Sequence, residues 1–438
     1  MNNLNKKKLT SDSIVVGFAL FAMFFGAGNV VFPPLLGMNA GVQWANGFMF
    51  YFIADIGLAL IAMFAILHAG GADNITGKIG HAASNVLMCA IILCIGPMVA
   101  IPRTAASTLE MSVMPFTSSI SPVLFSIAFF LLILLLSIKQ SAVVDIVGKI
   151  LTPALLIGLL VLIIKGIITP IGPIVNVGAS ATDVTVDGIK SGYQTMDVLA
   201  AMAFGIIILN SAKEKGYEDA KSSSKMIGIA ATLAGLLLMI VYLGLTYLGA
   251  TASTVFPADI SRANLVIGIV ELLLGKAGLV IFAVVVALAC ITTAVALVSS
   301  AASFFEKLTK GKVSYAVFVI AICVSSAVIS NLGLDMIISI ASPILDIVYP
   351  PTLVLILLSW FDKKLDKSVF VAAVIGALLA SVLGTLDHHG LNVPGVELLP
   401  LSELGLGWIT PAIVFGLIAY IFSKFKPKPQ RHTDNDYA

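Results

Sequence analysis

A glycine-rich turn lies inside an apolar run, Ile14 to Met38, that contains no charged side chain. The turn, Gly26-Ala27-Gly28-Asn29, is followed by Phe32-Pro33-Pro34. Glycine and proline weaken or remove helical hydrogen bonds, and irregular backbone at membrane depth is tolerated only where it lines a protein cavity. The pattern therefore predicts a membrane helix that is broken at its middle and faces a cavity.

A break at this position frees peptide groups of both polarities. The carbonyls of residues 22–25 would end one half-helix, and the amides of Ala27, Gly28 and Asn29 would begin the next. A zwitterionic amino acid fits this arrangement, with its carboxylate on the amides and its ammonium group on the carbonyls. The turn is not a dinucleotide-binding fingerprint, because it has no third glycine and no preceding strand.

A second candidate site is Ala289-Cys290-Ile291-Thr292-Thr293, in another apolar run. Two hydroxyls together with freed carbonyls form an all-oxygen site that suits a monovalent cation such as sodium. Alternatively, both threonines bond back to carbonyls of their own helix, as they commonly do in lipid.

Several ionisable residues lie within or at the ends of apolar runs, and such residues are functional candidates by default: Asp55, Arg103, Glu110, Asp145, Asp197 and Asp346. The sequence does not determine which acid pairs with Arg103 or carries a proton. Asp387, His388 and His389 are the only cluster of enzyme-like groups, and adjacent histidines in a polar loop are usually solvated. The four cysteines are expected to be small core residues.

The composition predicts an all-α membrane protein. The chain has 438 residues, of which 59% are hydrophobic and 11% charged, against about 25% charged in soluble proteins; its mean hydropathy is +1.07. We expect twelve transmembrane helices in the lipid bilayer, near 13–37, 43–67, 86–112, 120–137, 145–165, 190–212, 225–249, 278–304, 314–331, 334–361, 368–386 and 408–424. The net charge of +2 gives no reason to expect a nucleic-acid partner.

The distribution of Lys and Arg predicts that both termini are cytoplasmic. With that orientation, most of the 25 basic residues fall on the inner side, and the exceptions are Lys165, Lys190, Arg262 and Lys276 outside and Arg103 within a span. The first span is too long for a signal peptide and should be retained. The external segments would be 169–189, 250–277 and 387–407, and residues 264–274 should form a helix that is either a lid or a packing element.

The spans fall into two blocks of five, 13–165 and 190–361, which enter the membrane in opposite senses. Two additional helices, 368–424, follow, and short tails, 1–12 and 425–438, complete the chain. The span 190–212 is also expected to be irregular, with Asp197, a run of alanines and Gly205 at a possible kink. Interrupted helices at matching positions of inverted repeats indicate a transport site.

The chain resembles the bacterial branched-chain amino acid:cation symporter family over essentially its whole length. The resemblance rests on Phe24 to Asn29 with Phe32-Pro33-Pro34, on Gly96-Pro97 with Ile101 to Ala105, and on Met196-Asp197 through Ala203-Phe204-Gly205. It implies the leucine-transporter fold of the amino acid/polyamine/organocation superfamily, an inverted five-plus-five repeat with two extra helices. It also implies uptake of leucine, isoleucine and valine coupled to a cation, usually sodium.

The resemblance further implies the positions of the sites. The sodium ion would be bound by the carbonyls and hydroxyls of Ala22, Phe25, Ala289, Thr292 and Thr293. The substrate would be bound by Phe24, Gly26, Ala27, Gly28, Asn29, Val198, Ala201, Phe204, Thr293 and Leu297. The second sodium site known on this fold needs a hydroxyl where this chain has Leu199, so we expect one coupled ion.

The expected function is sodium-coupled uptake of branched-chain amino acids across a bacterial cell membrane, with no cofactor other than the coupling ion. One alternative is coupling to protons through Asp197 or Asp55. Others are an aromatic amino acid, a purine or a metal as substrate, or a channel or a membrane enzyme. The oligomeric state and the preference among the three aliphatic substrates are left open.

Overall fold

The computed structural model describes residues 3–117, 119–138 and 152–425. The described residues form helices and no β-strand, which confirms an all-α protein. Seven of the helices are long and apolar enough to cross a membrane, or eight if one bent pair is a single span. The first residues of the expected span 145–165, including Asp145, and residues 426–438 of the tail lie outside the described part.

The first half of the chain contains several interrupted helices. Its α-helices are α1 (Asn3–Phe24), α2 (Ala27–Ala40), α3 (Trp44–Phe52), α4 (Leu58–Ala69), α5 (Ala72–Thr76), α6 (His81–Leu93), α7 (Ala100–Thr108), α8 (Pro122–Ser137) and α10 (Thr152–Ile168). π-Helical turns join or extend some of them, at Ile53–Gly57, Cys94–Met98 and Leu109–Val113. Such turns are uncommon and often lie at functional sites.

The second half has longer helices: α11 (Ala181–Thr195), α12 (Asp197–Glu214), α13 (Ala220–Thr251), α14 (Arg262–Leu308), α15 (Tyr315–Ile329), α16 (Leu334–Ser359), α17 (Lys367–Leu386) and α18 (Ile409–Phe425). Helix α11 begins at Ala181 rather than near 190, because Ser180 and Asp183 form a capping box there. Gly275, with φ of 64°, divides α14. The part before Gly275 contains the expected helix at 264–274.

The bundle is held together by close helix contacts. Helix α13 contacts both α1 and α2, and glycines allow the approach to α2. A Cβ atom added to Gly37 would lie 1.8 Å from the Thr246 carbonyl oxygen, and one added to Gly249 would lie 1.9 Å from that of Pro34. Small residues at such crossings let backbones approach in membrane bundles.

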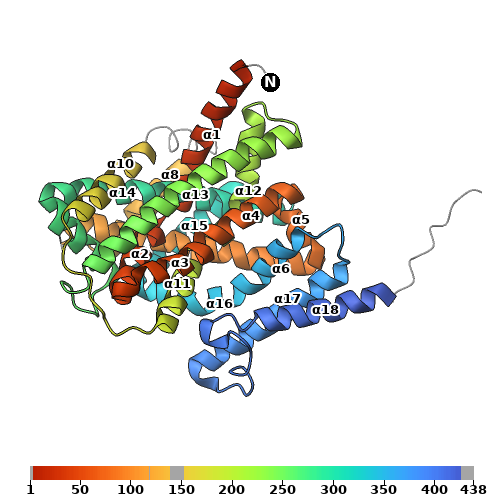
Figure 1. Cartoon of the computed structure of the whole chain (residues 1–438). Coiled ribbons are helices and arrows are strands. Elements are labelled where there is room, and N and C mark those ends of the chain that lie inside the picture. The colour runs from red at the N-terminus through yellow and green to blue at the C-terminus, as the bar shows by residue number, and fades with distance from the viewer. Residues whose placement is uncertain (1–2, 118, 139–151, 426–438) are drawn as a thin grey trace, which may run out of the picture.

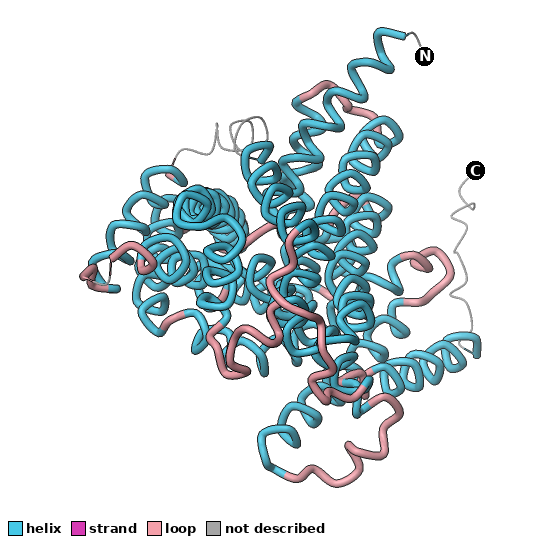
Figure 2. Tube along the Cα trace, turned by 60° about the vertical axis from the view of Figure 1, so that its left-hand side comes forward, coloured by secondary structure: helices cyan, strands magenta, loops and turns pink. Residues whose placement is uncertain are grey.

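Helices α17 and α18 contact each other, and α17 also contacts α16. They lie along one edge of the bundle (Figure 1), and the helix that leads to the C-terminus is also at the edge in the second view (Figure 2). Helix α2 contacts both α7 and α11, and α7 and α11 each contact α16. The peptide groups freed by the breaks are therefore inside the protein.

Candidate functional site

The first helix is broken between α1 and α2, as the glycines predict. The Phe25 amide still donates to the Phe21 carbonyl, at 2.7 Å. The Gly26 amide does not continue the ladder to Ala22 but donates to Asn29 Oδ1, at 3.3 Å. Gly26 is extended, with φ of −107° and ψ of −170°. The Ala22 carbonyl is thus released from its helical partner, next to the free N-terminus of α2.

A second break separates α11 from α12. Met196 adopts a left-handed conformation, with φ of 69°, and Asp197 is the first residue of α12. The break therefore lies just before Asp197, and the helix axis bends by 49° further on, between 181–205 and 207–214. A left-handed methionine costs about 1 kcal/mol or more. A carboxylate in the first turn of α12 complements the positive end of its helix dipole.

Arg103 of α7 lies at the end of α11. Its guanidinium donates to the carbonyls of Gln194, at 2.7 Å, and Thr195, at 3.3 Å. The side chain is buried, and its Nε has no partner. A cation at a helix C-terminus interacts favourably with the dipole and the free carbonyls. Arg103 therefore stabilises the break in the α11–α12 segment.

Asn29 connects the two breaks directly. Its Nδ2 donates to Asp197 Oδ2, at 3.1 Å, and to the Tyr242 hydroxyl oxygen of α13, while its Oδ1 accepts from Gly26. Every polar atom of the amide is thus used. The donor and acceptor chemistry fixes its orientation, since a carboxylate can only accept from Nδ2. The sequence named Asn29 as a site residue but did not identify Asp197 as its partner.

Asp55 approaches the same place from the π-helical turn between α3 and α4. Its Oδ1 accepts from the Thr195 hydroxyl at 2.8 Å, and its Oδ2 is buried without a partner. Among the other ionisable candidates, Glu110 accepts from the Leu334 amide at 2.8 Å and so caps α16. Asp346 lies on α16 and does not line the cavity described below.

The two threonines of α14 differ in their hydrogen bonds. Thr292 donates back to the Ala289 carbonyl at 2.9 Å. Thr293 Oγ1 is buried and has no partner, and a Cβ atom on Gly26 would lie 3.7 Å from it. The back-bonding alternative therefore describes Thr292, whereas the Thr293 hydroxyl faces the first helix break.

A cavity of about 30 Å³ lies between the breaks. The expected residues Phe24, Gly26, Ala27, Asn29, Thr293 and Leu297 line it, together with Met23, Ile95, Ala100, Arg103, Thr104, Thr195, Met196, Asp197 and Ala200. Of these nine, Arg103 and Asp197 were predicted as ionisable functional candidates, and the other seven were not predicted as site residues. Two sequence segments could have indicated these residues. Met196-Asp197 lies at the second break, and Gly96-Pro97 interrupts the helix just before α7, which contains Arg103.

Four expected substrate residues do not line the cavity. Gly28 lies against Arg103, and Val198, Ala201 and Phe204 are buried. The Phe204 ring packs against that of Phe24, with centroids 6.3 Å apart. Because the break lies at Met196, the residues presented to the cavity are Thr195, Met196, Asp197 and Ala200. Val198, Ala201 and Phe204 are fully buried on the same helix.

The cavity between the breaks is small and is lined by both apolar and polar side chains, Arg103 and Asp197 among them. A larger cavity, about 220 Å³, lies away from the breaks, between the ends of α4 and α16. The described residues contain no group of three or more His, Cys, Asp or Glu that could hold a metal ion. All four cysteines are free.

The fold is similar to those of two solved transporters. The structure is similar to that of the Eremococcus coleocola manganese transporter, with a TM-score of 0.61 and 12% identity over 97% of both chains. It is also similar to Mhp1, a nucleobase-cation-symport-1 family transporter, with a TM-score of 0.62 and 14% identity over 94% of this chain and 93% of that one.

The family model described as branched-chain amino acid transport protein matches residues 9–426, and the chain belongs to this family. The Pseudomonas aeruginosa branched-chain amino acid transport system 2 carrier protein is 37% identical over 96% of this chain and 98% of its own length. The Bacillus subtilis branched-chain amino acid permease BraB is 34% identical, over 94% and 96%. These relatives are permeases and carriers, so the chain is a membrane transporter and not an enzyme.

Proposed function

We propose that this protein takes up leucine, isoleucine and valine by symport with sodium through alternating access. In this proposal twelve helices span the bacterial cell membrane, ten in an inverted five-plus-five repeat and two, α17 and α18, outside it. Both termini are cytoplasmic, in agreement with the distribution of Lys and Arg. Segments α1–α2 and α11–α12 are the matching broken helices of the two repeats.

The observation that carries the sodium assignment is the unpaired Thr293 hydroxyl. A buried hydroxyl without a hydrogen bond costs roughly 1–3 kcal/mol, which a bound cation would offset. Thr293 Oγ1 is buried without a partner and lies 3.7 Å from a Cβ atom built on Gly26, at the break whose carbonyl end includes Ala22. The Thr292 hydroxyl and the carbonyls of Phe25 and Ala289 complete an uncharged oxygen site that suits sodium.

The substrate would lie across the break. Its carboxylate would meet the N-terminus of α2, where the helix dipole and Arg103 both supply positive charge. Its ammonium group would meet the carbonyl end of α1 and Asp197. The aliphatic side chain would contact apolar groups that line the cavity: Met23, Phe24, Ile95, Ala100, Met196, Ala200 and Leu297. Each buried methylene contributes about 0.8 kcal/mol, so leucine would be preferred over alanine but poorly separated from isoleucine.

The test is leucine uptake into proteoliposomes with an imposed sodium gradient and equal pH on both sides. Thr293→Val should raise the sodium concentration for half-maximal uptake roughly tenfold or more, since a ligand to a charge is worth about 1.5–3 kcal/mol. Thr293→Ser should retain most of the sodium affinity. Thr352→Val is the control, because Thr352 is buried in α16 and donates to its own helix at Val348.

Unchanged sodium dependence in Thr293→Val would refute the sodium site. The second candidate function is proton-coupled symport of the same substrates, favoured by the buried carboxyl groups of Asp55 and Asp197. Uptake that follows an imposed pH gradient and ignores sodium would establish that alternative. Counterflow, in which internal leucine accelerates entry of labelled leucine, would distinguish both from a channel.

A further inference from the structure

Two acidic side chains from different irregular helices lie at one side of the cavity, which Asp197 lines and Asp55 does not. Asp55 lies in the π-helical turn after α3, and Asp197 begins α12; they are 0% and 3% exposed. Asp55 contacts the hydroxyl of Thr195, two residues before Asp197 in the chain, and the two carboxyl groups are close enough to interact electrostatically. Two adjacent carboxylates away from water repel each other, and each pays a desolvation cost of several kcal/mol.

The positive charge nearby is insufficient for two carboxylates. Arg103 interacts with Asp197 through space, but it donates to the carbonyls of Gln194 and Thr195. No ion pair of the described residues joins Arg103 to either acid. The other ionisable groups that face the pair are hydroxyls: Tyr51 of α3, Tyr242 of α13 and Tyr349 of α16. With both acids ionised, the site would contain one uncompensated negative charge.

The hydrogen bonds also fall short by one hydrogen. The Thr195 hydroxyl has a single hydrogen, yet it contacts both the Gly192 carbonyl and Asp55 Oδ1. If Thr195 donates to Gly192, Asp55 must itself be the donor to Thr195. Asp55 Oδ2 has no partner at all. One hydrogen on Asp55 Oδ1 would satisfy the Thr195 contact, and an unpartnered Oδ2 is less costly on a neutral carboxyl group than on a carboxylate.

We propose that Asp55 and Asp197 form a binding site for one proton, separate from the sodium site, and that leucine binds to the protonated form. The ligand is a proton rather than a sodium ion, because Arg103 already occupies the nearby carbonyls and its charge would repel a second cation. One bound proton leaves the pair with a single negative charge, which Arg103 balances. The proton is held whichever ion drives transport.

The direct test is infrared spectroscopy of the purified protein, in which a protonated buried carboxyl group gives its own carbonyl-stretch band. The wild-type protein should show this band at neutral pH and lose it as the pH rises. The band should be absent in Asp55→Asn or in Asp197→Asn. It should remain in Asp346→Asn, a half-buried acid of α16 away from the cavity, and in Tyr51→Phe, which removes a neighbouring hydroxyl.

The wild-type titration needs no variant to fold. Absence of a pH-dependent carboxyl band in the wild type would overturn the proposal. So would loss of the band on adding sodium at constant pH, because the pair would then be a cation site. Neither reading depends on transport, so a failure here is distinct from a failure of the sodium proposal.

A second measurement, the pH dependence of leucine binding at saturating sodium, rests on the proposed function. If binding requires the proton, leucine affinity should fall tenfold per pH unit above the pH at which the band disappears. In Asp55→Asn, leucine affinity should not depend on pH over this range. A wild-type affinity that does not change over the pH range in which the band is lost would overturn the link between proton and substrate.

Discussion

A methyl group on Gly28 would lie 2.7 Å from a guanidinium nitrogen of Arg103. The two residues come from α2 and α7, and the guanidinium also holds the carbonyl end of α11. Residue 28 must therefore be small so that Arg103 can join the two broken segments. Because Gly28 is helical and not left-handed, the requirement comes from this contact and not from its own backbone.

Gly28→Ala should therefore weaken leucine transport without unfolding the protein. The new methyl group would displace Arg103 from Gln194 and Thr195, and losing hydrogen bonds from a charged group costs about 1.5–3 kcal/mol. We expect a fall in leucine affinity of roughly tenfold or more. Gly77→Ala is the control, since nothing lies within 4 Å of a Cβ atom at that position. Equal affinities in the two variants would contradict the proposed role of the Gly28–Arg103 contact.

Gly249→Ala should destabilise the protein rather than change its specificity. Its methyl group would lie 1.9 Å from the Pro34 carbonyl oxygen, which belongs to backbone and cannot rotate away. Overpacking of this kind costs about 1–3 kcal/mol or more. The thermal unfolding midpoint in detergent should fall. Gly228→Ala in the same helix meets only an ordinary 3.5 Å contact, so its midpoint should be unchanged or higher, because alanine is the better helix former.

The sequence predicted the first helix break because Gly26, Gly28 and the two prolines mark it locally. The second break lies at Met196, which is neither glycine, asparagine nor proline, so the only local signal was the Asp197 carboxyl group in an apolar run. The break is stabilised by Arg103, which is distant in the sequence, and by Asp197 at the start of α12. For that reason the residues assigned from span six were displaced from those that line the cavity. Tertiary contacts, rather than local propensity, determine its position.

For the ionisable residues too, the sequence predicted which side chains matter but not what they contact. Their burial in apolar runs was sufficient to name Asp55, Arg103 and Asp197 as candidates. Their partners depend on the π-helical turn at Ile53–Gly57 and on the helix crossings, which no local pattern specifies. Arg103 consequently pairs with carbonyls and not with an acid.

Leu297→Ala should reduce the preference for larger aliphatic substrates. Leu297 is 3% exposed and lines the cavity beside Thr293. Removing its side chain deletes contacts worth about 0.8 kcal/mol per methylene of substrate, so leucine affinity should fall more than alanine affinity. Competition of labelled leucine uptake by each amino acid measures this. Leu297→Met conserves the volume and should keep the wild-type order; a parallel loss for leucine and alanine in Leu297→Ala would place Leu297 outside the side-chain pocket.

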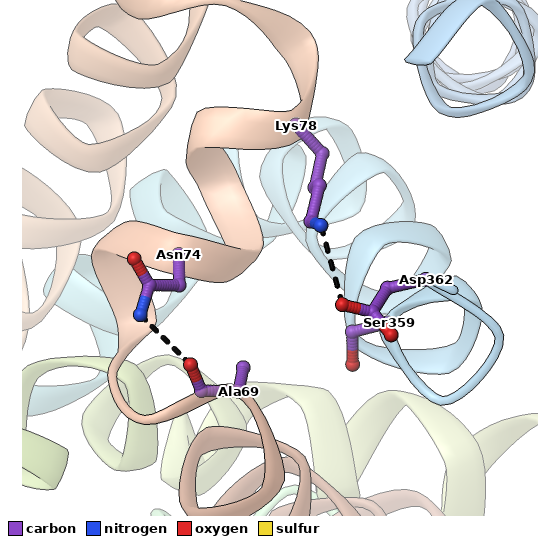
Figure 3. A pocket seen from close by; sticks show the side chains of 5 residues that line it. All are labelled: Ala69, Asn74, Lys78, Ser359 and Asp362. Carbon is purple, nitrogen blue, oxygen red and sulfur yellow. Dashed lines mark hydrogen bonds and ion pairs between the residues drawn. The ribbon is translucent and has the colours of Figure 1, made fainter. Parts of the chain in front are cut away.

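The ion pair between Lys78 and Asp362 should contribute a small, pH-dependent stability. Lys78 follows α5 and Asp362 follows α16, with Nζ and Oδ2 3.3 Å apart across the larger cavity, beside the Asn74–Ala69 hydrogen bond (Figure 3). The hydrogen bond from Lys78 is the main reason that the pKa of Asp362 is lowered from its usual 3.8. Since the folded-state pKa is depressed, the contribution is present above the usual value and is lost as the pH falls through the lowered one.

Both side chains are about one-third exposed or slightly less, so solvent screens the pair and its worth should be below about 1 kcal/mol. Lys78→Gln should lower the thermal unfolding midpoint slightly at pH 7 and not at all at a pH below the lowered pKa. Lys78→Gln should have no further effect in an Asp362→Asn background, which measures the pair directly. Lys312→Gln, an exposed lysine outside any ion pair of the described residues, controls for net charge. If Lys78→Gln still lowers the unfolding midpoint in the Asp362→Asn background, the effect does not come from the Lys78–Asp362 ion pair.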